Sequence, residues 1–226
     1  MSENEITIVI PAKNEERNIE DILVKCLSIT DSVIVVDGHS KDGTRAVAEK
    51  HNAKVVLDNG RGKGDGIRSV IPHLQRDITV FIDADGSHDP ADIPALLMPL
   101  KRGEADHVTG SRLIGGSSEL HGGFDEFFRL AGSAFITACI NWRFKQKLSD
   151  SQNGFRAVKT SVLKQLDLRE NITTIEQEMI MKTLKKGFRM GEVPAHEYCR
   201  KSGTSNISIK RVWFRYVYTL FKYLFF

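Results

Sequence analysis

The sequence predicts one α/β domain, built on a mainly parallel central sheet with helices on both faces. Over the first hundred residues, short apolar runs rich in Val and Ile alternate with segments whose apolar residues recur at helical spacing. Strands of a parallel sheet are buried on both faces and therefore read as continuous apolar runs, as these do. With 226 residues, of which 41% are hydrophobic, the chain can bury one sizeable core.

Five strands are expected in the first half of the chain, where β-branched apolar residues cluster between turn residues. They span residues 6–10, 32–36, 54–57, 78–82 and 107–109, and Pro11 ends the first of them. Helical spacing between the strands predicts helices over residues 14–27, 42–51, 67–74 and 92–101. Asn14 is the expected N-cap of the first helix, and Pro94 lies in the first turn of the fourth, where proline is tolerated.

The second half is predicted to be mainly helical. Helical patterns cover residues 124–147 and 174–186, and a strand is expected over 189–196. The closing segment, IKRVWFRYVYTLFKYLFF, combines cations with large apolar side chains at helical spacing. We therefore expect an α/β domain over residues 1–205 and a C-terminal amphipathic helix over residues 206–226.

Carboxylates stand at the tips of two expected strands. Asp37 follows SVIVV, and Asp83 and Asp85 follow TVFI in the segment VFIDADGSHDP. Ligands of open α/β sheets bind beyond the carboxyl ends of the strands, so these acids are expected at a ligand-binding edge. Two close carboxylates repel each other unless a cation lies with them, and Mg²⁺ or Mn²⁺ bound to a substrate diphosphate would relieve that repulsion. The alternative is helix capping, a task that Asp89 or Asp92 can perform.

The glycine-rich segment NGRGKGDG does not match a phosphate loop, because both G-x-x-x-x-G-K-[ST] and G-x-G-x-x-G are absent from it. Its flexible backbone, with Arg61 and Lys63, is still suited to contact a diphosphate. A solvated turn is the alternative.

Several polar residues are assigned structural roles at this point. His39 and His88 are interpreted as surface residues that hydrogen-bond within loops. Glu176 and Glu178 are interpreted as acids that favour the dipole of a helix from its first turn. The three cysteines are widely spaced and show no CxxC pair, which favours a reducing, cytosolic setting without a zinc site or disulfide framework.

Three segments in order resemble glycosyltransferase family 2, whose members have the GT-A nucleotide-sugar fold. They are IVIPAKNEERNIE, VVDGHSKDGT and FIDADGSHDP. The later segments GSRLIGG, DSQNGFRAVK and RKSGTS resemble the branch of this family that makes polyprenyl-phosphate (dolichyl-phosphate) sugars. The resemblance runs from Ile6 to about Ser205, and it implies a metal-dependent transferase that uses a nucleotide sugar. The Q-x-x-R-W motif of processive polysaccharide synthases is absent, which argues against polymer synthesis.

Carried onto this sequence, the resemblance implies a set of donor-binding residues. Asp37 would hydrogen-bond the nucleotide base, Asp83 would contact the ribose or the metal, and Asp85 would ligate the metal directly. Ser87, which stands where the branch often has Gln, is the third candidate metal residue; its hydroxyl is a poorer metal ligand than an amide carbonyl, so a water can substitute for it. Pro11, Lys13 and Glu15 would line the nucleotide pocket, and Lys63 of the glycine-rich segment, which the resemblance does not cover, is added as a candidate donor contact.

The resemblance also implies cations that serve the transfer. Arg112 and Arg129 would hold the acceptor phosphate, and Arg200 would sit on a loop that closes over the donor. A phosphate acceptor is already an anion at pH 7 and needs cations rather than a general base, and the planar guanidinium suits it. Direct displacement would invert the anomeric centre. The lysine that commonly ends the late loop is replaced by Asn206, although Lys201 is close by.

The leading hypothesis is transfer of a hexose from a UDP- or GDP-sugar, with a slight preference for UDP, to polyprenyl or dolichyl phosphate. The alternative is a family 2 enzyme that acts on a hydroxyl of a sugar or protein, with Asp150 as general base. A module that binds nucleotide sugars without catalysis is a third possibility; it predicts donor affinity without sugar release.

The tail after Glu197 has six cations and no acid, although the whole chain has a net charge of only +3. Along its helix, Arg211, Arg215 and Lys222 form one stripe, opposite apolar residues that include Trp213, Val217, Leu220 and Leu224. The segment is too charged to span a bilayer, so we expect it to lie in the interface of a membrane, peripherally on the cytoplasmic face. Packing on the domain or another subunit is the alternative, and no nucleic acid is expected as a partner.

Overall fold

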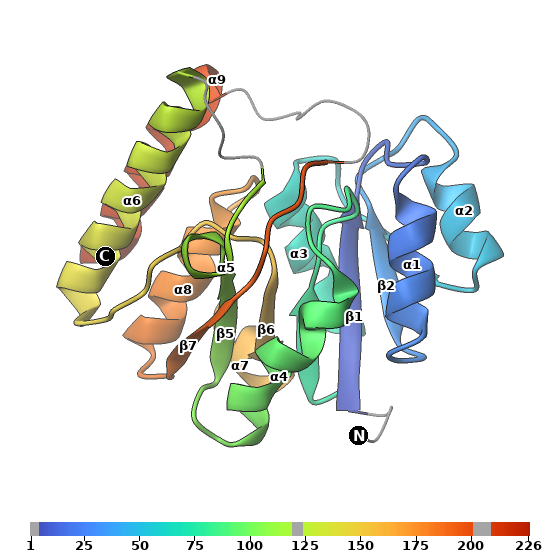
Figure 1. The fold of residues 1–226 in the computed structure, drawn as a ribbon, viewed down its shortest axis with the longest axis horizontal. Helices are drawn as coiled ribbons and strands as arrows, with labels where there is room; N and C mark the ends of the chain where they lie inside the picture. Colours follow the sequence, from blue (N-terminus) through green and yellow to red (C-terminus); the bar gives the residue numbers. More distant parts are fainter. Residues whose placement is uncertain (1–4, 119–123, 201–208) are drawn as a thin grey trace.

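The computed structural model describes residues 5–118, 124–200 and 209–226, with the backbone alone for residues 124–129 and 209–212. Within these residues one seven-stranded sheet forms the centre of the molecule, in the order β3-β2-β1-β4-β6-β5-β7 (Figure 1). The strands are β1 Ile6–Ala12, β2 Val33–Asp37, β3 Lys54–Leu57, β4 Ile78–Phe81, β5 His107–Ser111, β6 Arg156–Lys159 and β7 Met190–Pro194.

Helices and short 3₁₀ segments connect the strands. The α-helices are α1 Ile19–Leu27, α2 Thr44–Lys50, α3 Lys63–Val70, α4 Ile93–Lys101, α5 Arg112–Gly115, α6 Phe124–Phe144, α7 Thr160–Gln165, α8 Ile175–Lys185 and α9 Ile209–Phe225. The 3₁₀ segments are η2 Ile71–His73 and η3 Pro90–Asp92. The expected alternation of strands and helices in the first half is confirmed.

The sheet is parallel except for β6, which runs antiparallel to both neighbours, β4 and β5. The carboxyl ends of the other described strands therefore meet at one edge, shown uppermost in Figure 1. The loop before β6 arrives at that same edge. Neither β6 nor α7 was expected from the sequence, because the four residues of β6, RAVK, do not form an apolar run.

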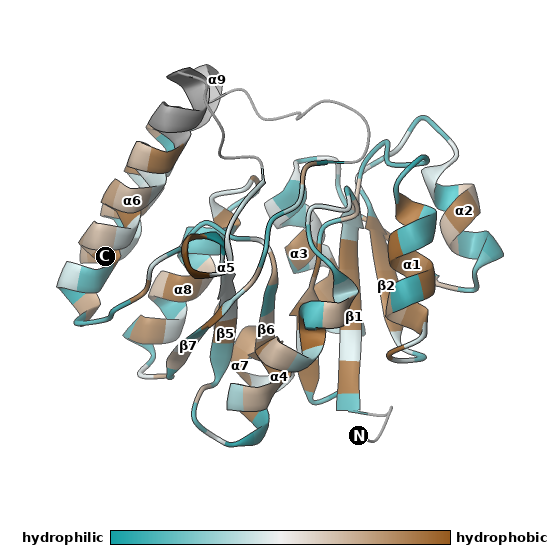
Figure 2. Ribbon diagram, viewed as in Figure 1, coloured by the Kyte–Doolittle hydropathy of each residue, from teal (hydrophilic) through white to brown (hydrophobic). Residues whose placement is uncertain are grey.

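Helices cover both faces of the sheet, as predicted. Ile8 and Ile10 of β1 face a layer made by α1, α2 and α4, whereas Val9 between them faces a layer made by α3, α7 and α8. β1 and β2 are correspondingly apolar along most of their length (Figure 2). The predicted mainly parallel sheet with helices on both faces is confirmed, and its two layers position the loops at the carboxyl edge.

The C-terminal amphipathic helix is present, and one of its faces is buried. α9 lies beside α6 (Figure 1), and Leu220, Tyr223 and Leu224 pack with Ile136 and Ile140 of α6 and with residues of α8. Leu220 and Leu224 were expected on the apolar face that contacts the membrane, and this was wrong because both are core residues. Their burial agrees with the alternative of packing on the domain. The exposed side chains of α9 are mainly aromatic and include Trp213, Phe214, Tyr218, Phe221 and Phe225.

Two local predictions at the start of helices were also wrong. Asn14 does not cap α1, which begins at Ile19; it has a left-handed φ of 57°, and its Oδ1 accepts a hydrogen bond from Lys41 N. The glycine-rich segment is not a free loop, because α3 begins at Lys63. A Cβ on Gly64 would lie 2.5 Å from the carbonyl oxygen of Glu170, so glycine there allows α3 to approach that neighbouring segment.

Candidate functional site

The carboxyl edge of the sheet gathers residues from segments far apart in the sequence. Asp37 ends β2, Asp83 follows β4 and Arg112 follows β5, while Gly154 precedes the antiparallel β6. The order of the sheet therefore sets Asp37, Asp83 and Arg112 in one row along the edge. A ligand bound at this edge can contact all three strands.

Lys63 of α3 links two acids at the centre of this row. Its Nζ lies 2.7 Å and 2.9 Å from the two carboxylate oxygens of Asp83 and 3.0 Å from Oε1 of Glu176. Burial would raise the pKa of Asp83, but the Lys63 ammonium more than offsets this and lowers it. Glu176 therefore lies in the site; the interpretation of this residue as only a helix-dipole acid was wrong.

Gly154 lies directly over this contact. A Cβ at this position would stand 2.7 Å from Nζ of Lys63 and 2.8 Å from Oδ2 of Asp83. Arg156 holds the loop that contains Gly154 in place, because its guanidinium donates to the carbonyl oxygens of Asn153 and Glu176. The loop before β6 and the first turn of α8 are thereby tied together at the site.

Arg200 joins two further acids of the site. It donates to Oε1 of Glu15 at 3.0 Å and to Oδ2 of Asp85 at 2.7 Å. Partial burial raises the pKa of Glu15 despite hydrogen bonds from Asn18 and Arg200. The backbone N of Ser87 donates to Oδ1 of Asp85 at 3.0 Å, which holds this carboxylate at the edge.

Asp37 lies at the carboxyl end of β2. It is fully buried, accepts hydrogen bonds from Ser40 N, and pairs with Arg45 at 2.9 Å. Burial alone would raise the pKa of Asp37, but these hydrogen bonds from Ser40 and Arg45 lower it. Pro11, in register with Val36, and the exposed Lys13 lie on the adjoining strand end of β1.

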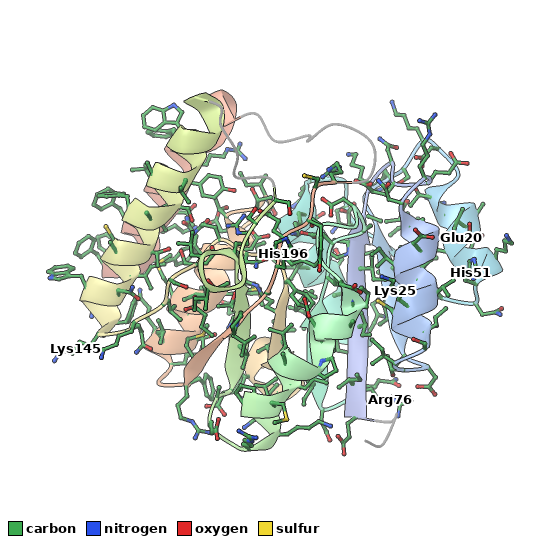
Figure 3. The ribbon with its side chains drawn as sticks, viewed as in Figure 1. Glu20, Lys25, His51, Arg76, Lys145 and His196 are labelled. Carbon is green, nitrogen blue, oxygen red and sulfur yellow. The ribbon has the colours of Figure 1, made fainter. Side chains whose placement is uncertain are left out.

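Arg112 is enclosed by acids. Its Nε and Nη2 donate to the two carboxylate oxygens of Asp150, at 2.6 Å and 3.1 Å, and its Nη1 donates to Glu197 at 3.2 Å. Burial would raise the pKa of Asp150, but Arg112 lowers it. Asp150 is thus an ionised partner of Arg112. Beyond it, His196 (Figure 3) ties the segment after β7 to α5 through the Gly115 carbonyl oxygen.

His88 and Ser87 form a buried pair rather than a surface loop. The Ser87 hydroxyl and His88 Nδ1 are 3.2 Å apart, and the imidazole stacks on Phe155. Burial lowers the pKa of His88, so the ring is neutral at pH 7. The earlier interpretation of His88 as a surface residue was wrong. Arg129 lies in α6, but its side chain is outside the described residues, so its role stays a prediction.

A metal ion bound at this edge would need oxygen ligands from the substrate as well as from the protein. Among the described residues, no three His, Cys, Asp or Glu side chains form a group that could hold a metal ion. Magnesium is commonly bound by one or two carboxylates together with substrate phosphates, and Asp85, at the edge with Asp83 beside it, fits that arrangement.

Comparison with known proteins identifies the family. The sequence profile described as Glycosyl transferase family 2 matches residues 7–167. This chain belongs to glycosyl transferase family 2. The matched range includes the Asp37, Asp83–Asp85, Arg112 and Asp150 segments of the edge.

Relatives of this family 2 chain include two archaeal proteins that are named as transferases. It is 30% identical over 207 residues to the glycosyltransferase AglJ of Haloferax volcanii, a match that covers 88% of this chain and 65% of AglJ. It is 27% identical over 243 residues to a UDP-N-acetylglucosamine–dolichyl-phosphate N-acetylglucosaminyltransferase of Methanococcus voltae, with 95% and 96% of the two chains covered.

Solved structures confirm the fold of this family 2 chain. Glucosyl-3-phosphoglycerate synthase from Mycobacterium tuberculosis, in complex with Mn²⁺, UDP and glucosyl-3-phosphoglycerate, matches with a TM-score of 0.76 and 22% identity. The match covers 98% of this chain and 80% of the synthase. The same synthase has also been solved with Mg²⁺ and UDP.

Proposed function

We propose that this protein is an inverting, metal-dependent glycosyltransferase that moves a hexose from a nucleotide sugar to polyprenyl or dolichyl phosphate. The observation that carries the proposal is the row of Asp37, Asp83 and Asp85 at the carboxyl edge of a family 2 chain. The M. voltae relative is named for UDP-N-acetylglucosamine and dolichyl phosphate, and the M. tuberculosis synthase holds UDP with Mn²⁺ or Mg²⁺. We favour UDP over GDP as the donor nucleotide.

The donor would lie across the ends of β2, β1 and β4. Asp37 receives the base, and Pro11, Lys13 and Glu15 line the nucleotide pocket. Lys63 and Arg200 are the cations beside the acids that face the diphosphate. A divalent ion held by Asp85 and the diphosphate would neutralise the negative charge of the leaving group.

The acceptor would approach from the β5 side, where Arg112 stands. An anionic phosphate needs cations rather than a base, and Arg112, Arg129 and Arg200 are the candidates. The alternative, a hydroxyl acceptor deprotonated by Asp150, requires a competent base. Arg112 lowers the pKa of Asp150, which weakens that carboxylate as a base and supports the phosphate acceptor.

We further propose that the protein binds peripherally to the cytoplasmic face of a membrane. The exposed aromatic face of α9, together with Phe135 and Trp142 of α6, supports the membrane contact itself. None of the described helices is both long and apolar enough to cross a bilayer. Of the expected basic stripe, Arg215 is exposed and available to lipid headgroups. Lys222 instead pairs with Glu170 at 2.9 Å, which lowers the positive charge that the stripe can present. The aromatic rings, more than the cations, would carry the binding.

Radiolabelled sugar transfer tests the proposal. UDP- and GDP-hexoses are supplied with Mg²⁺ or Mn²⁺ and a short polyprenyl phosphate, and lipid-linked product is measured. We expect product from the wild type and a loss of at least about 100-fold in Asp85→Ala, because a metal-binding charge in a transition state contributes several kcal/mol. Asp92→Ala, in the nearby η3, is the matched control.

Two results would redirect the proposal. Release of free nucleotide without lipid product would retain the donor site but reject polyprenyl phosphate as acceptor, and would favour hydroxyl acceptors and Asp150. Donor binding without any sugar release would indicate a binding module.

A further inference from the structure

The α7–α8 loop, residues 166–174, is tied to α9 by one carboxylate. This is the side chain of Glu170, and both of its oxygens are occupied. It accepts hydrogen bonds of 2.9–3.3 Å from three residues of α9 and from the N-cap residue of α8, namely Lys222 Nζ, Tyr223 OH, Thr219 Oγ1 and Thr174 Oγ1. Burial would raise the pKa of Glu170, but the hydrogen bonds from Lys222 and Thr174 lower it. A carboxylate with this many donors is held in one place.

The backbone of the same loop lies against the start of α3, where Lys63 stands. A Cβ on Gly62 would lie 2.8 Å from the carbonyl oxygen of Asn171, and a Cβ on Gly64 would lie 2.5 Å from that of Glu170. Glycine at both positions lets the two backbones approach this closely. The α7–α8 loop therefore contacts α3 on either side of Lys63.

Hydrogen bonds fix this contact between the loop and α3. Asp65 N, in the first turn of α3, donates to the carbonyl oxygen of Asn171 at 3.1 Å. Arg68 of the same helix donates to the side-chain oxygen of Asn171 and, at 2.9 Å, to Asp65. Close-packed interiors transmit small displacements, so a shift of the α7–α8 loop is expected to move the start of α3 with it.

Other contacts also support the loop. Its Thr173 hydroxyl lies within hydrogen-bond distance of the Tyr216 hydroxyl of α9, and Glu170 N donates to Oε2 of Glu178 at 2.8 Å. These contacts would keep the loop folded when the Glu170 side chain is removed. Loss of that side chain should therefore displace the start of α3 without unfolding the protein.

We infer that Glu170 is a positioning residue of the donor site: by fixing the α7–α8 loop to α9, it holds Lys63 in place for the diphosphate of the nucleotide sugar. Lys63 Nζ lies 2.7 Å from Oδ1 of Asp83, a contact that a small movement of α3 would change. The inference rests on the proposed function, which places Lys63 beside the diphosphate. It gives α9 a part in donor binding that is separate from its contact with lipid.

A double-variant cycle in nucleotide affinity tests the inference. Calorimetry measures the Kd of UDP or GDP, whichever binds more tightly, with Mn²⁺ for the wild type, Glu170→Ala, Lys63→Gln and the double variant. We expect Lys63→Gln to weaken binding about 10–100-fold, as for a hydrogen bond between charged groups, and Glu170→Ala to weaken it about three- to tenfold. Because Glu170 acts through Lys63, the double variant should bind within about twofold of Lys63→Gln alone.

Arg143→Met is the matched control. Arg143 Nε donates to the carbonyl oxygen of Leu224 at 3.2 Å, so this variant loosens the other end of α9 and leaves the α7–α8 loop in place. We expect it to lower the melting temperature, as Glu170→Ala does, but to keep the Kd within about twofold of the wild type. Glu170→Gln, which retains the size of the side chain, replaces Glu170→Ala in the cycle if the latter does not fold.

The contrary results can be told apart. If the effects of the Glu170 and Lys63 variants multiply in the double variant, or if Arg143→Met weakens binding as much as Glu170→Ala, Glu170 only stabilises the fold and the inference is overturned. An unchanged Kd in Lys63→Gln also overturns it, because Glu170 would then have nothing to act through. A wild type that binds neither UDP nor GDP with Mn²⁺ would reject the proposed function, and the inference with it.

Discussion

Each acid of the site has a cation of the same chain beside it. Lys63 accompanies Asp83, Arg200 accompanies Asp85, and Arg112 accompanies Asp150. Lys63 lowers the pKa of Asp83 and Arg112 lowers the pKa of Asp150, although burial opposes both shifts. An incoming diphosphate must compete with the acids for the same cations, which is a physical reason for it to arrive with a divalent ion.

Gly154→Ala should reduce activity while the protein still folds. The added Cβ would meet the ends of two flexible side chains, Lys63 and Asp83, which can move aside at small cost to stability but lose their contact. We expect a fall in kcat/KM of about tenfold or more, the size of one charged hydrogen bond, with the melting temperature nearly unchanged. Gly132→Ala in α6, where an added Cβ meets nothing within 4 Å, is the control. Full activity of Gly154→Ala would show that the Lys63–Asp83 contact is dispensable.

Asp150→Asn separates the two acceptor classes. With a phosphate acceptor, losing the charge only loosens Arg112, so the KM for the acceptor should rise about tenfold or less while kcat is largely kept. With a hydroxyl acceptor, kcat should fall by at least about 100-fold, because general-base catalysis contributes about 10²–10⁴-fold. Steady-state kinetics with both acceptor types distinguish these outcomes, and a collapse of kcat with polyprenyl phosphate would contradict the phosphate mechanism.

At the scale of elements, a cluster of charged side chains links β5, β6 and β7 at the end of the sheet opposite the site. Asp106, just before β5, accepts hydrogen bonds from Arg189, before β7, and from Lys159, at the end of β6. The hydrogen bonds from Arg189 hold the pKa of Asp106 well below its usual range, although partial burial opposes this. The cluster sets the register of the three strands that carry the acceptor side of the site.

Asp106→Asn should destabilise the protein by about 1–2 kcal/mol at pH 7, within the range for hydrogen bonds to a charged group. Because the folded pKa is depressed, this stabilisation is fully present above the unfolded pKa of about 3.9 and is lost as the pH falls toward the folded pKa. Thermal unfolding of the two proteins should therefore differ by a constant amount from pH 7 to 5 and converge below pH 4. A difference that grows on acidification would contradict the assignment.

The sequence predicts a feature well when neighbouring residues determine it, and poorly when residues far apart in the chain do. Strands such as β2 and helix positions such as Ile19 and Ile22 follow from the nearest residues, and both were anticipated. Glu176 was not, because only the fold brings it to Lys63, and neither was the short polar β6. The N-cap prediction for Asn14 was wrong because its amide oxygen accepts a hydrogen bond from the distant Lys41 N and not from its own helix.

At the scale of the whole molecule, the aromatic face of α9 is connected to the carboxyl edge of the sheet through α8. α9 packs on α6 and α8, and the carbonyl oxygen of Tyr216 accepts a hydrogen bond from Gln177, next to Glu176. Burial raises the pKa of Tyr216 to about 12, so its hydroxyl stays protonated beside Thr173. A membrane bound by α9 would thus hold the site at a fixed height above the lipid.

Replacing Trp213, Phe221 and Phe225 together by Ser should weaken binding to anionic lipid vesicles. Each ring contributes about 1.5–3 kcal/mol when buried in an apolar phase, so a loss of at least tenfold in the partition coefficient is expected. Co-sedimentation measures it, and Leu57→Ser, an exposed apolar residue on β3, is the control. Unchanged sedimentation of the triple variant would reject the membrane face.

The tie between Gln177 and Tyr216 has a practical consequence for anyone who produces this protein. A tail rich in exposed aromatic rings is the first segment that a protein chemist would trim to improve solubility. Here trimming it would uncover Ile136, Ile140 and Ile180 and release the first turn of α8. Surface substitution of the outward-facing rings is therefore the better route to a soluble sample that keeps its activity.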